Sequence, residues 1–360
     1  MMKYFHSLTI LFLLLIMGCS PEAGEQMIGA KIYEYSGPHK LLFEQWNDMG
    51  INTGFCSQEL ISDREFMKEA RDHKISTFLI FPVFFNSEAI AESPDLSAIN
   101  RNGEAAAEEW LEFVCPSRED YRQQLVERAR RIVREHQPDG ISIDFIRHFV
   151  YWEKVYPDRD PATLPVSCFD STCLNHFQAE MGVSIPNELN SISEQADWIL
   201  NNHEDAWTTW RCQLITSMAK DVAEAAREEK PDILVNIHLV PWAKDDFNGG
   251  IRRVAGQDIK ALSHISDYLS PMTYAHMVKQ SPDWVHHIVE DIYMQTGGTV
   301  LPSIQVGKAY LETEFDLEEF RETVKAALQP PSSGVIIWSW EHLIAEPAKV
   351  DLFKDIVTAQ

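Results

Sequence analysis

Short apolar runs rich in β-branched and aromatic residues alternate with amphipathic stretches of helical period along most of the chain. This alternation is typical of a parallel α/β fold, in which each strand is followed by a helix. Eight runs meet the description of a strand, and they cover residues 28–35, 52–56, 76–84, 140–145, 234–240, 268–276, 300–306 and 334–340. The pattern therefore predicts eight βα units.

Eight βα units over residues 27–360 fit a single (β/α)8 barrel, the TIM-barrel fold. A doubly wound sheet usually carries a glycine-rich phosphate loop after its first strand, and this sequence has none there. A long excursion, residues 149–202, separates the fourth predicted strand from the fifth. Loops that follow barrel strands lie at the C-terminal face, so we expect this excursion to wall the functional site.

The N-terminus carries the features of an export signal. Lys3 precedes an apolar run over residues 8–17, which is too short to span a bilayer as an ordinary helix. The run ends in Ile16-Met17-Gly18-Cys19, which resembles the bacterial lipobox and implies removal of residues 1–18 and lipidation of Cys19. We then expect residues 19–26 to be a tether and the protein to be lipid-anchored in the bacterial cell envelope, at the periplasmic or surface face of the outer membrane. An ordinary secretory peptide with a chance cysteine is the alternative.

The charge of the chain disfavours one class of partner. The sequence has 31 basic and 55 acidic residues, a formal net charge of −24, and no basic cluster. Because nucleic-acid binding depends on neutralising phosphates with Lys and Arg, we expect no nucleic-acid partner. Acidity of this kind is also common on surfaces that only confer solubility.

The cysteine spacing leaves several interpretations open. With Cys19 lipidated, five cysteines remain, and Cys168 and Cys173 enclose only four residues. This pair could close a disulfide loop in an oxidising envelope, remain as free thiols, or form half of a zinc site. Because no second cysteine pair lies nearby in the sequence, disulfide or free thiols are favoured, and we expect no metal.

The fourth predicted strand is the most informative for chemistry. Its apolar residues, Phe145 among them, alternate with Ser142 and Asp144, so a period of two directs the apolar set to the helices and the other two into the barrel. Asp144 is then at the mouth of the barrel, where TIM-barrel enzymes carry catalytic groups. Burying a carboxylate in an apolar strand is costly unless it pairs with a cation or takes part in the function of the protein. A nearby Arg147 would keep Asp144 ionised. A purely structural Asp144, satisfied by Arg147, is the alternative.

Three segments at strand positions carry a resemblance to known proteins. Asp139-Gly-Ile-Ser-Ile-Asp144 resembles the strand-four motif Asp-Gly-x-Asp-x-Asp-x-Glu of chitinase-like family 18 glycoside hydrolases. Tyr268-Leu-Ser-Pro-Met-Thr-Tyr274 is similar to their Met-x-Tyr-Asp, and Gly334-Val-Ile-Ile-Trp338-Ser-Trp-Glu341 is similar to their closing Gly-x-Met-x-Trp-x-x-Asp. Asp144-Phe-Ile-Arg147, with Phe113-Val-Cys-Pro-Ser117 upstream, is closer to uncharacterised glycosyl-hydrolase-like barrels that read Leu-Asp-Tyr-Ile-Arg-Tyr-Pro. The resemblance spans most of residues 27–345 and implies a glycosidase-like barrel.

Departures from the family 18 motifs change the chemistry that the resemblance implies. Ile146 stands where that family has its acid Glu, Ser142 replaces its first inner Asp, and Ala275 replaces the Asp after its strand-six Tyr. Substrate-assisted chitinase chemistry is therefore not implied, and neither is chitin as the substrate.

Hydrolysis of a glycosidic bond ordinarily needs two carboxyl groups, one acid and one base or nucleophile. Asp144 is the first candidate. Glu341 is the favoured partner because it follows two tryptophans, whose apolar surroundings could raise its pKa toward that of a working acid. Glu34, at the end of the first strand, is the rival, and either glutamate could be a hydrogen-bonded rim residue. If neither reaches Asp144, the excursion offers Glu153 or Asp170.

Polar and aromatic side chains near the strand ends could bind a sugar, because carbohydrate recognition combines aromatic faces with hydrogen-bonding groups. The candidate substrate-binding residues are Arg147, His148, Asn236, His238, Trp242, Tyr274, His276, Gln305, Trp338 and Trp340. Each of them alone is more often a packing residue than a ligand-binding one. Their shared position at strand ends predicts a carbohydrate substrate.

The sequence as a whole predicts an envelope-anchored glycoside hydrolase that acts on a poly- or oligosaccharide through two carboxylates and without a cofactor. A non-catalytic carbohydrate-binding lipoprotein on a degenerate barrel is the alternative, because Ile146 and Ala275 remove acidic residues of family 18. A metal-dependent barrel hydrolase is disfavoured, because the first strand ends in Tyr33-Glu-Tyr35 and not in a metal-binding His-x-His pair.

Overall fold

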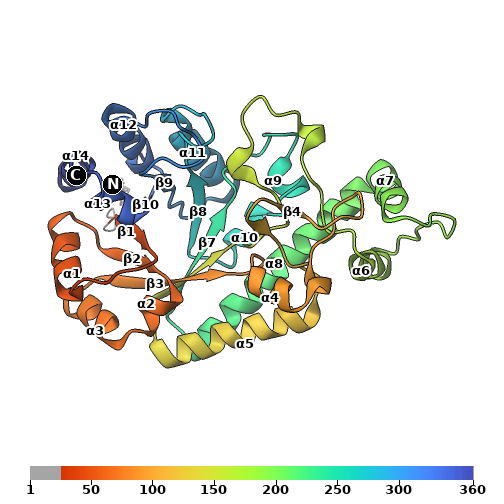
Figure 1. Ribbon diagram of the computed structural model, residues 1–360, viewed down its shortest axis with the longest axis horizontal. Coiled ribbons are helices and arrows are strands. Elements are labelled where there is room, and N and C mark those ends of the chain that lie inside the picture. Colours follow the sequence, from red (N-terminus) through yellow and green to blue (C-terminus); the bar gives the residue numbers. More distant parts are fainter. Residues whose placement is uncertain (1–25, 360) are drawn as a thin grey trace, which may run out of the picture.

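The computed structural model describes residues 26–359, in which eight parallel strands close into a barrel with helices between them (Figure 1). Around the barrel the order is β1-β10-β9-β8-β7-β6-β3-β2. The barrel strands are β1 (Met27–Ile32), β2 (Thr53–Cys56), β3 (Ser76–Pro82), β6 (Gly140–Asp144), β7 (Leu234–Leu239), β8 (Tyr268–Thr273), β9 (Ser303–Gln305) and β10 (Gly334–Trp338). The predicted (β/α)8 TIM barrel is confirmed. The predicted signal peptide and Cys19 lie outside the described residues.

All eight predicted strands are present, and most end slightly earlier than the sequence pattern suggested. They end where the chain turns into the loops of the C-terminal face, as at Phe145, whose φ of 49° is incompatible with a strand. Alternation along β6 is as predicted, because Ser142 Oγ accepts a hydrogen bond of 2.9 Å from Asn236 Nδ2 of β7 inside the barrel.

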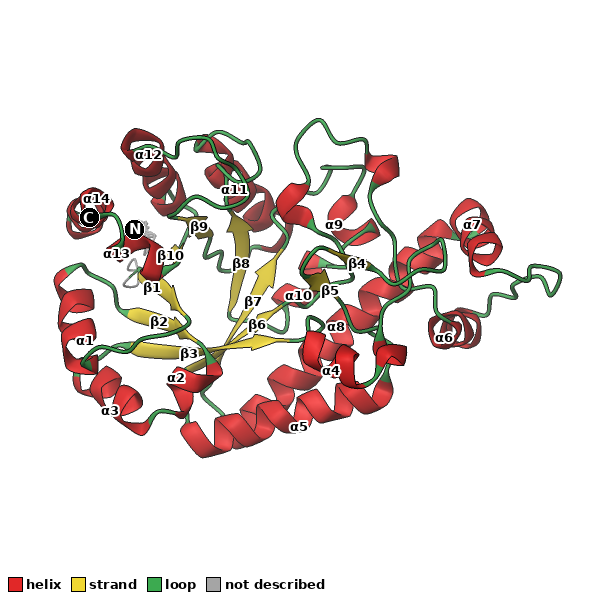
Figure 2. Cartoon of the chain, in the orientation of Figure 1, coloured by secondary structure: helices red, strands yellow, loops and turns green. Residues whose placement is uncertain are grey.

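Helices surround the barrel (Figure 2). Several of them carry an apolar stripe that packs on the strands. In α5 the stripe includes Leu125, Ala129 and Ile132, all buried. No helix among residues 26–359 combines the length and apolar character needed to cross a membrane. The helices of the barrel layer are α1 (His39–Asp48), α2 (Gln58–Ser62), α3 (Arg64–Asp72), α5 (Glu119–His136), α8 (Glu204–Glu229), α9 (Gly250–Arg253), α10 (Ile259–Ser263), α11 (Asp283–Thr296), α12 (Leu317–Leu328), α13 (Trp340–Ile344) and α14 (Pro347–Thr358).

The hydrophobic core has two parts, as in other closed barrels. A small cluster of Phe55, Phe78, Leu301 and Ile336 fills the interior. A much larger cluster lies between the strands and the helix layer and continues under the loops of the C-terminal face. The filled interior leaves the strand ends above it as the place where a ligand can bind.

Two long excursions build this C-terminal face. The predicted one, after β6, contains the 3-10 helices η2 (Trp152–Lys154) and η3 (Pro161–Thr163) and the helices α6 (Ser171–Met181) and α7 (Ile192–Asn202). In Figure 1, α6 and α7 project away from the barrel. A second excursion, not predicted, follows β3 and contains α4 (Ser87–Glu92), η1 (Pro94–Leu96) and the hairpin β4 (Ala107–Glu108) and β5 (Leu111–Glu112). Two-residue strands are too short to show a period of two in the sequence.

Candidate active site

Asp144 ends β6 at the mouth of the barrel, as the strand pattern predicted. Its side chain is buried, and Oδ1 accepts a hydrogen bond of 2.7 Å from the backbone N–H of Phe145. Oδ2 lies 3.7 Å from Nζ of Lys31, a fully buried lysine on β1. Lys31 is therefore the cation paired with Asp144, and Arg147, the cation expected from the sequence, adds a smaller electrostatic stabilisation of the ionised form.

The surroundings of Asp144 favour its ionised form. Burial alone would raise the pKa of this carboxyl. The His238 ring in its protonated form, the Lys31 ammonium, the Phe145 N–H and the Arg147 guanidinium outweigh burial and hold the pKa below its usual value of 3.8. Burial lowers the pKa of Lys31, and the charge of Asp144 opposes that shift. Lys31 was the missed signal in the sequence, a lone lysine at an inward position of an apolar strand.

The floor below Asp144 is a neutral hydrogen-bonded network. His238 Nε2 and Ser142 Oγ are 3.0 Å apart, and Oδ1 of Asn236 accepts a bond of 2.6 Å from Ser270 Oγ. Burial, with a smaller contribution from the Lys31 charge, lowers the pKa of His238 to about 3, so this imidazole is uncharged at neutral pH. Asn236 and His238, predicted to bind substrate, instead support the base of the site.

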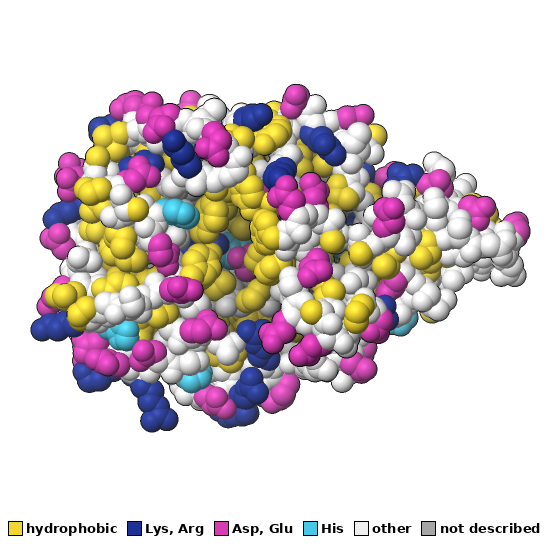
Figure 3. All heavy atoms as spheres, in the orientation of Figure 1, with side chains coloured by type: hydrophobic (Ala, Val, Ile, Leu, Met, Phe, Trp, Pro, Cys, Tyr) yellow, Lys and Arg dark blue, Asp and Glu magenta, His cyan; other side chains and the backbone are white. Residues whose placement is uncertain are grey.

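A cavity of about 320 Å³ opens above this floor. Figure 3 shows a hollow in this face of the molecule, with mainly hydrophobic walls. Side chains from β1, β6, β8 and β10, from the loops after β1, β8 and β9, and from both excursions line the cavity. They are Lys31, Tyr33, Trp110, Asp144, Phe145, Arg147, Trp152, Glu153, Met272, Tyr274, Met277, Tyr310 and Trp338.

Aromatic rings form the wall of the cavity. Tyr274 and Trp338 stack with ring centroids 4.6 Å apart, and Trp152 lies 5.6 Å from Tyr274. Phe145 also lines the cavity, although the strand pattern directed it to the helices, because the backbone leaves the extended conformation at this residue. Tyr274 and Trp338 therefore occupy the positions predicted for substrate contact.

Glu153 brings a second carboxyl into the same cavity. It belongs to η2 in the excursion after β6, and its Oε1 lies 4.0 Å from Nη2 of Arg147. Burial raises the pKa of Glu153 to about 7, Arg147 opposes the shift, and the charge of Asp144 adds to it. The cavity therefore holds two carboxyl groups whose pKa values are displaced in opposite directions.

Several polar atoms at the cavity lack a protein partner. Among residues 26–359, no partner is found for Oε2 of Glu153, for Nε and Nη1 of Arg147, or for Nε1 of Trp152. The Arg147 guanidinium is held over the rings of Phe113 and Phe145, at 4.8 and 5.3 Å. Buried groups of this kind usually bind water or a ligand, so the cavity presents both donors and an acceptor to a polar guest.

Glu341 and Glu34, the two predicted partners of Asp144, do not line this cavity. The Glu341 side chain lies in the first turn of α13, and its Oε1 accepts hydrogen bonds from the backbone N–H groups of Tyr33 at 2.8 Å and Glu34 at 3.3 Å. Glu34 itself is exposed. Glu341 therefore fixes the loop after β1.

We expect Glu341→Ala to lower the free energy of unfolding by about 1–3 kcal/mol, because two backbone donors lose a charged acceptor. In the same variant kcat should change by less than about tenfold. Glu341→Gln keeps one acceptor oxygen and should be milder in stability. Urea unfolding and turnover are measured on the same preparations. A folded Glu341→Gln protein that has lost more than about a hundredfold in kcat would place Glu341 in the mechanism.

Four further predicted ligand-binding residues do not line the cavity, and their side chains have structural partners. His148 Nε2 donates to the carbonyl of Arg211 at 3.2 Å, and His276 Nδ1 donates to Glu319 Oε1 at 3.0 Å. Gln305 accepts from the N–H of Met277 at 2.9 Å and donates to the carbonyl of Gly307 at 2.7 Å. Trp340 lies in α13 and packs on Trp46 at 5.8 Å. Their position at strand ends was correctly predicted, but their side chains hold loops and helices.

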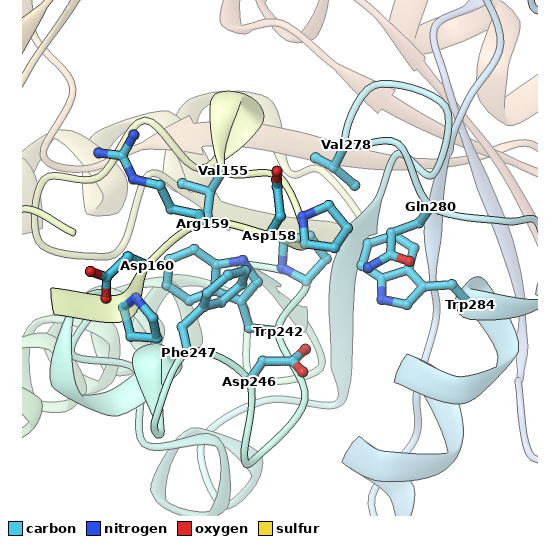
Figure 4. Close-up of a pocket in the computed structure, with 13 residues that line it drawn as sticks. Val155, Asp158, Arg159, Asp160, Trp242, Asp246, Phe247, Val278, Gln280 and Trp284 are labelled. Carbon is cyan, nitrogen blue, oxygen red and sulfur yellow. The ribbon is translucent and has the colours of Figure 1, made fainter. Parts of the chain in front are cut away.

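Trp242 lies in a second cavity of about 360 Å³ on the same face. Figure 4 shows Trp242 and Phe247, from the loop after β7, and Trp284 of α11 among its lining residues, with carboxylates such as Asp158 of the excursion. Val155 and Val278 also line it, and they closely follow Glu153 and Met277 of the first cavity in the chain. The two cavities therefore share the loops that follow β6 and β8.

No protein-family model and no curated protein matches the chain. Solved structures do share its fold. The PgaB (BpsB) glycoside hydrolase domain from Bordetella bronchiseptica matches with a TM-score of 0.70 at 10% identity, over 92% of this chain and 99% of that domain. A β-galactosidase from Marinomonas ef1 gives 0.67 at 11% identity, and an α-L-fucosidase from Paenibacillus thiaminolyticus gives 0.57 at 13%.

These two comparisons cover 92% and 93% of this chain but only 59% and 49% of the longer enzymes, so the chain spans roughly half of their length. At such low identity the similarity establishes the fold alone. The chain has the barrel seen in glycoside hydrolases, and the finer resemblance to family 18 stays a prediction.

Proposed function

We propose that the protein is a glycoside hydrolase that uses Asp144 and Glu153 as its two carboxyl groups. The observation that carries this proposal is the opposite displacement of their pKa values within one aromatic-walled cavity. Pairs of carboxyl groups whose environments separate their pKa values are the usual arrangement for one acid and one base or nucleophile at neutral pH. The barrel shared with glycoside hydrolases supports the same reaction class.

Each carboxyl group has a distinct role in this proposal. Glu153, protonated up to about pH 7, donates its proton to the glycosidic oxygen as the bond to the leaving sugar breaks. Asp144, ionised beside Lys31, either attacks the anomeric carbon or activates the water that does. Arg147 donates hydrogen bonds to the substrate from the groups that lack a partner among the described residues.

The substrate that suits this site is a poly- or oligosaccharide. Stacked Tyr274 and Trp338 present aromatic surface of the kind that packs on the CH groups of a sugar ring. The neighbouring cavity around Trp242 and Trp284 offers room and aromatic surface for further sugar units of the same chain.

Incubation of the purified protein with a panel of polysaccharides and aryl glycosides tests this function. Release of reducing ends from at least one glycan is expected. Binding to a glycan without any turnover would instead support the alternative, a carbohydrate-binding protein on a degenerate barrel. If the protein neither binds nor cleaves any glycan, both the hydrolase and the carbohydrate-binding function are wrong.

We also propose that the protein is lipid-anchored in the bacterial envelope through Cys19, which lies outside the described residues. The apolar run that ends in Gly18-Cys19 is the support. Cys19→Ser should abolish incorporation of labelled lipid and leave residues 1–18 attached, as read by gel autoradiography and N-terminal mass spectrometry. Lipid labelling that persists in Cys19→Ser would show the lipobox interpretation to be wrong.

A further inference from the structure

Three cysteines and one aspartate converge under the two excursions, outside the candidate active site. Cys115 precedes α5, Cys168 and Asp170 lie just before α6, and Cys173 belongs to the first turn of α6. All four are buried, and their ligand atoms lie within 4.8 Å of one another. Cys115 Sγ and Cys173 Sγ lie 3.3 Å apart. In the described chain every cysteine is a free thiol, so the loop between Cys168 and Cys173 is not closed by a disulfide.

We propose that Cys115, Cys168, Cys173 and Asp170 bind one zinc ion. Thiolate and carboxylate are both zinc ligands, and four protein ligands complete a tetrahedral site. Two sulfurs bound to zinc at about 2.3 Å each lie about 3.8 Å apart, so the present spacing needs adjustments of only about 1 Å. Binding releases the three thiol protons to solvent, and a closed site of this kind is structural and does not act in catalysis.

Groups around the cluster are placed to support metal-bound ligands. The backbone N–H of Ile99 donates to Cys168 Sγ at 3.1 Å. Ser117 Oγ lies 3.2 Å from Cys173 Sγ, so its hydroxyl can donate to this sulfur once the thiol proton has left. Arg118 Nη2 lies 2.7 Å from Asp170 Oδ2. Outer hydrogen bonds of these types orient ligands and raise metal affinity.

The charge of the occupied site would also be balanced. Zinc with three thiolates and one carboxylate carries a net charge of −2, which Arg118 and Arg211 can neutralise. Arg211 is fully buried, donates to the carbonyls of Arg253 and Val254, and has no carboxylate partner among the described residues. Burial lowers the pKa of Arg211 to about 10, and the thiols of Cys212, Cys173 and Cys168 act in the opposite direction. An anionic metal complex would supply the missing counter-charge.

A disulfide explains the convergence of these four groups less completely than a zinc ion does. It would use two of the three sulfurs and leave a free buried thiol and a carboxylate beside the bond. A thiol in that position would exchange with the disulfide once ionised. Zinc uses all four groups at once.

Such a site would join the two excursions that form the roof of the candidate active site. Trp110 comes from the first excursion, five residues before Cys115, and Glu153 comes from the second. The proposal does not depend on glycosidase activity, because metal content is measured without a substrate.

Metal analysis of the full chain, expressed with zinc in the medium, tests the site. We expect about one zinc per chain in the wild type and at least about tenfold less in Cys168→Ser and Cys173→Ser. Asp170→Asn keeps the oxygen that caps α6 and should weaken zinc binding by a similar factor. Cys56→Ser, which removes a buried cysteine outside the cluster, is the matched control and should keep its zinc.

A wild-type chain without zinc, or one in which peptide mapping finds any two cluster cysteines joined by a disulfide, overturns the proposal. So does an equal loss of zinc in Cys56→Ser. If the serine variants fail to fold, cobalt uptake by metal-stripped wild type decides. Thiolate-to-cobalt charge-transfer bands with tetrahedral d–d bands support the site, and cobalt bound without them contradicts it.

Discussion

Glu153→Gln is expected to lower kcat on oligosaccharides by about a hundredfold or more, because the amide cannot donate the proton that the leaving oxygen needs. Aryl glycosides with an acidic phenol as the leaving group do not need this proton, because the phenolate leaves unprotonated. The turnover of these substrates should therefore fall much less. Gln keeps the size of Glu153 and can still bond Arg147. Comparing kcat for the two substrate types in the same preparation isolates the role of the acid.

A matched control for this variant is Glu188→Gln, which removes an exposed carboxyl from the same excursion. It should leave both activities unchanged. Equal losses on both substrate types in Glu153→Gln would contradict a role as acid, and unchanged activity on oligosaccharides would remove Glu153 from the mechanism.

Asp144→Asn should cost at least two to three orders of magnitude in turnover on both substrate types, roughly 3–4 kcal/mol of transition-state stabilisation. The neutral amide can neither attack the anomeric carbon nor accept a proton from water. Asn can keep the bond from the Phe145 N–H, and Lys31 can release its proton, since burial already lowers its pKa. The fold should therefore persist, as read by circular dichroism and thermal unfolding.

Near-normal activity in Asp144→Asn would exclude Asp144 from the reaction. A large fall in melting temperature with little loss of activity per folded molecule would instead support a structural role for the pair with Lys31.

The strands and the position of Asp144 could be predicted because a period of two leaves a direct trace in the sequence. Ser142 and Asp144 interrupt an apolar run at alternate positions, and the barrel places both of them inside. The same pattern wrongly directed Phe145 to the helices, because the strand ends at Asp144 and the next residue has a positive φ.

The identity of the second carboxyl group could not be predicted from a strand pattern. Glu153 lies in an irregular excursion, where no periodicity indicates which side chains point inward. The sequence therefore offers Glu153 only as a second choice, together with Asp170. The sequence favours Glu341, but α13 begins at Trp340, two residues after the end of β10, and its first turn carries Glu341 to the backbone of Tyr33. Asp170, the other fallback, belongs to the cysteine cluster.

The cysteine cluster was hidden for a related reason. Cys115 is far from Cys168 in the sequence, and the contact between the two excursions brings them together. Pair spacing alone favoured a disulfide or free thiols. Only the fold adds the third sulfur and the carboxylate.

The pH dependence of kcat/KM tests the roles of Glu153 and Asp144 together, because it reports the pKa values of the acid and the base in the free enzyme. Glu153 acts while protonated, so activity should fall above about pH 7. Asp144 acts while ionised, so activity should fall only at acidic pH, below the usual aspartate pKa of 3.8. We expect a bell-shaped profile with these two limbs, and loss of the alkaline limb in Glu153→Gln. A profile that stays flat to about pH 9, or an alkaline limb that persists in Glu153→Gln, would contradict it.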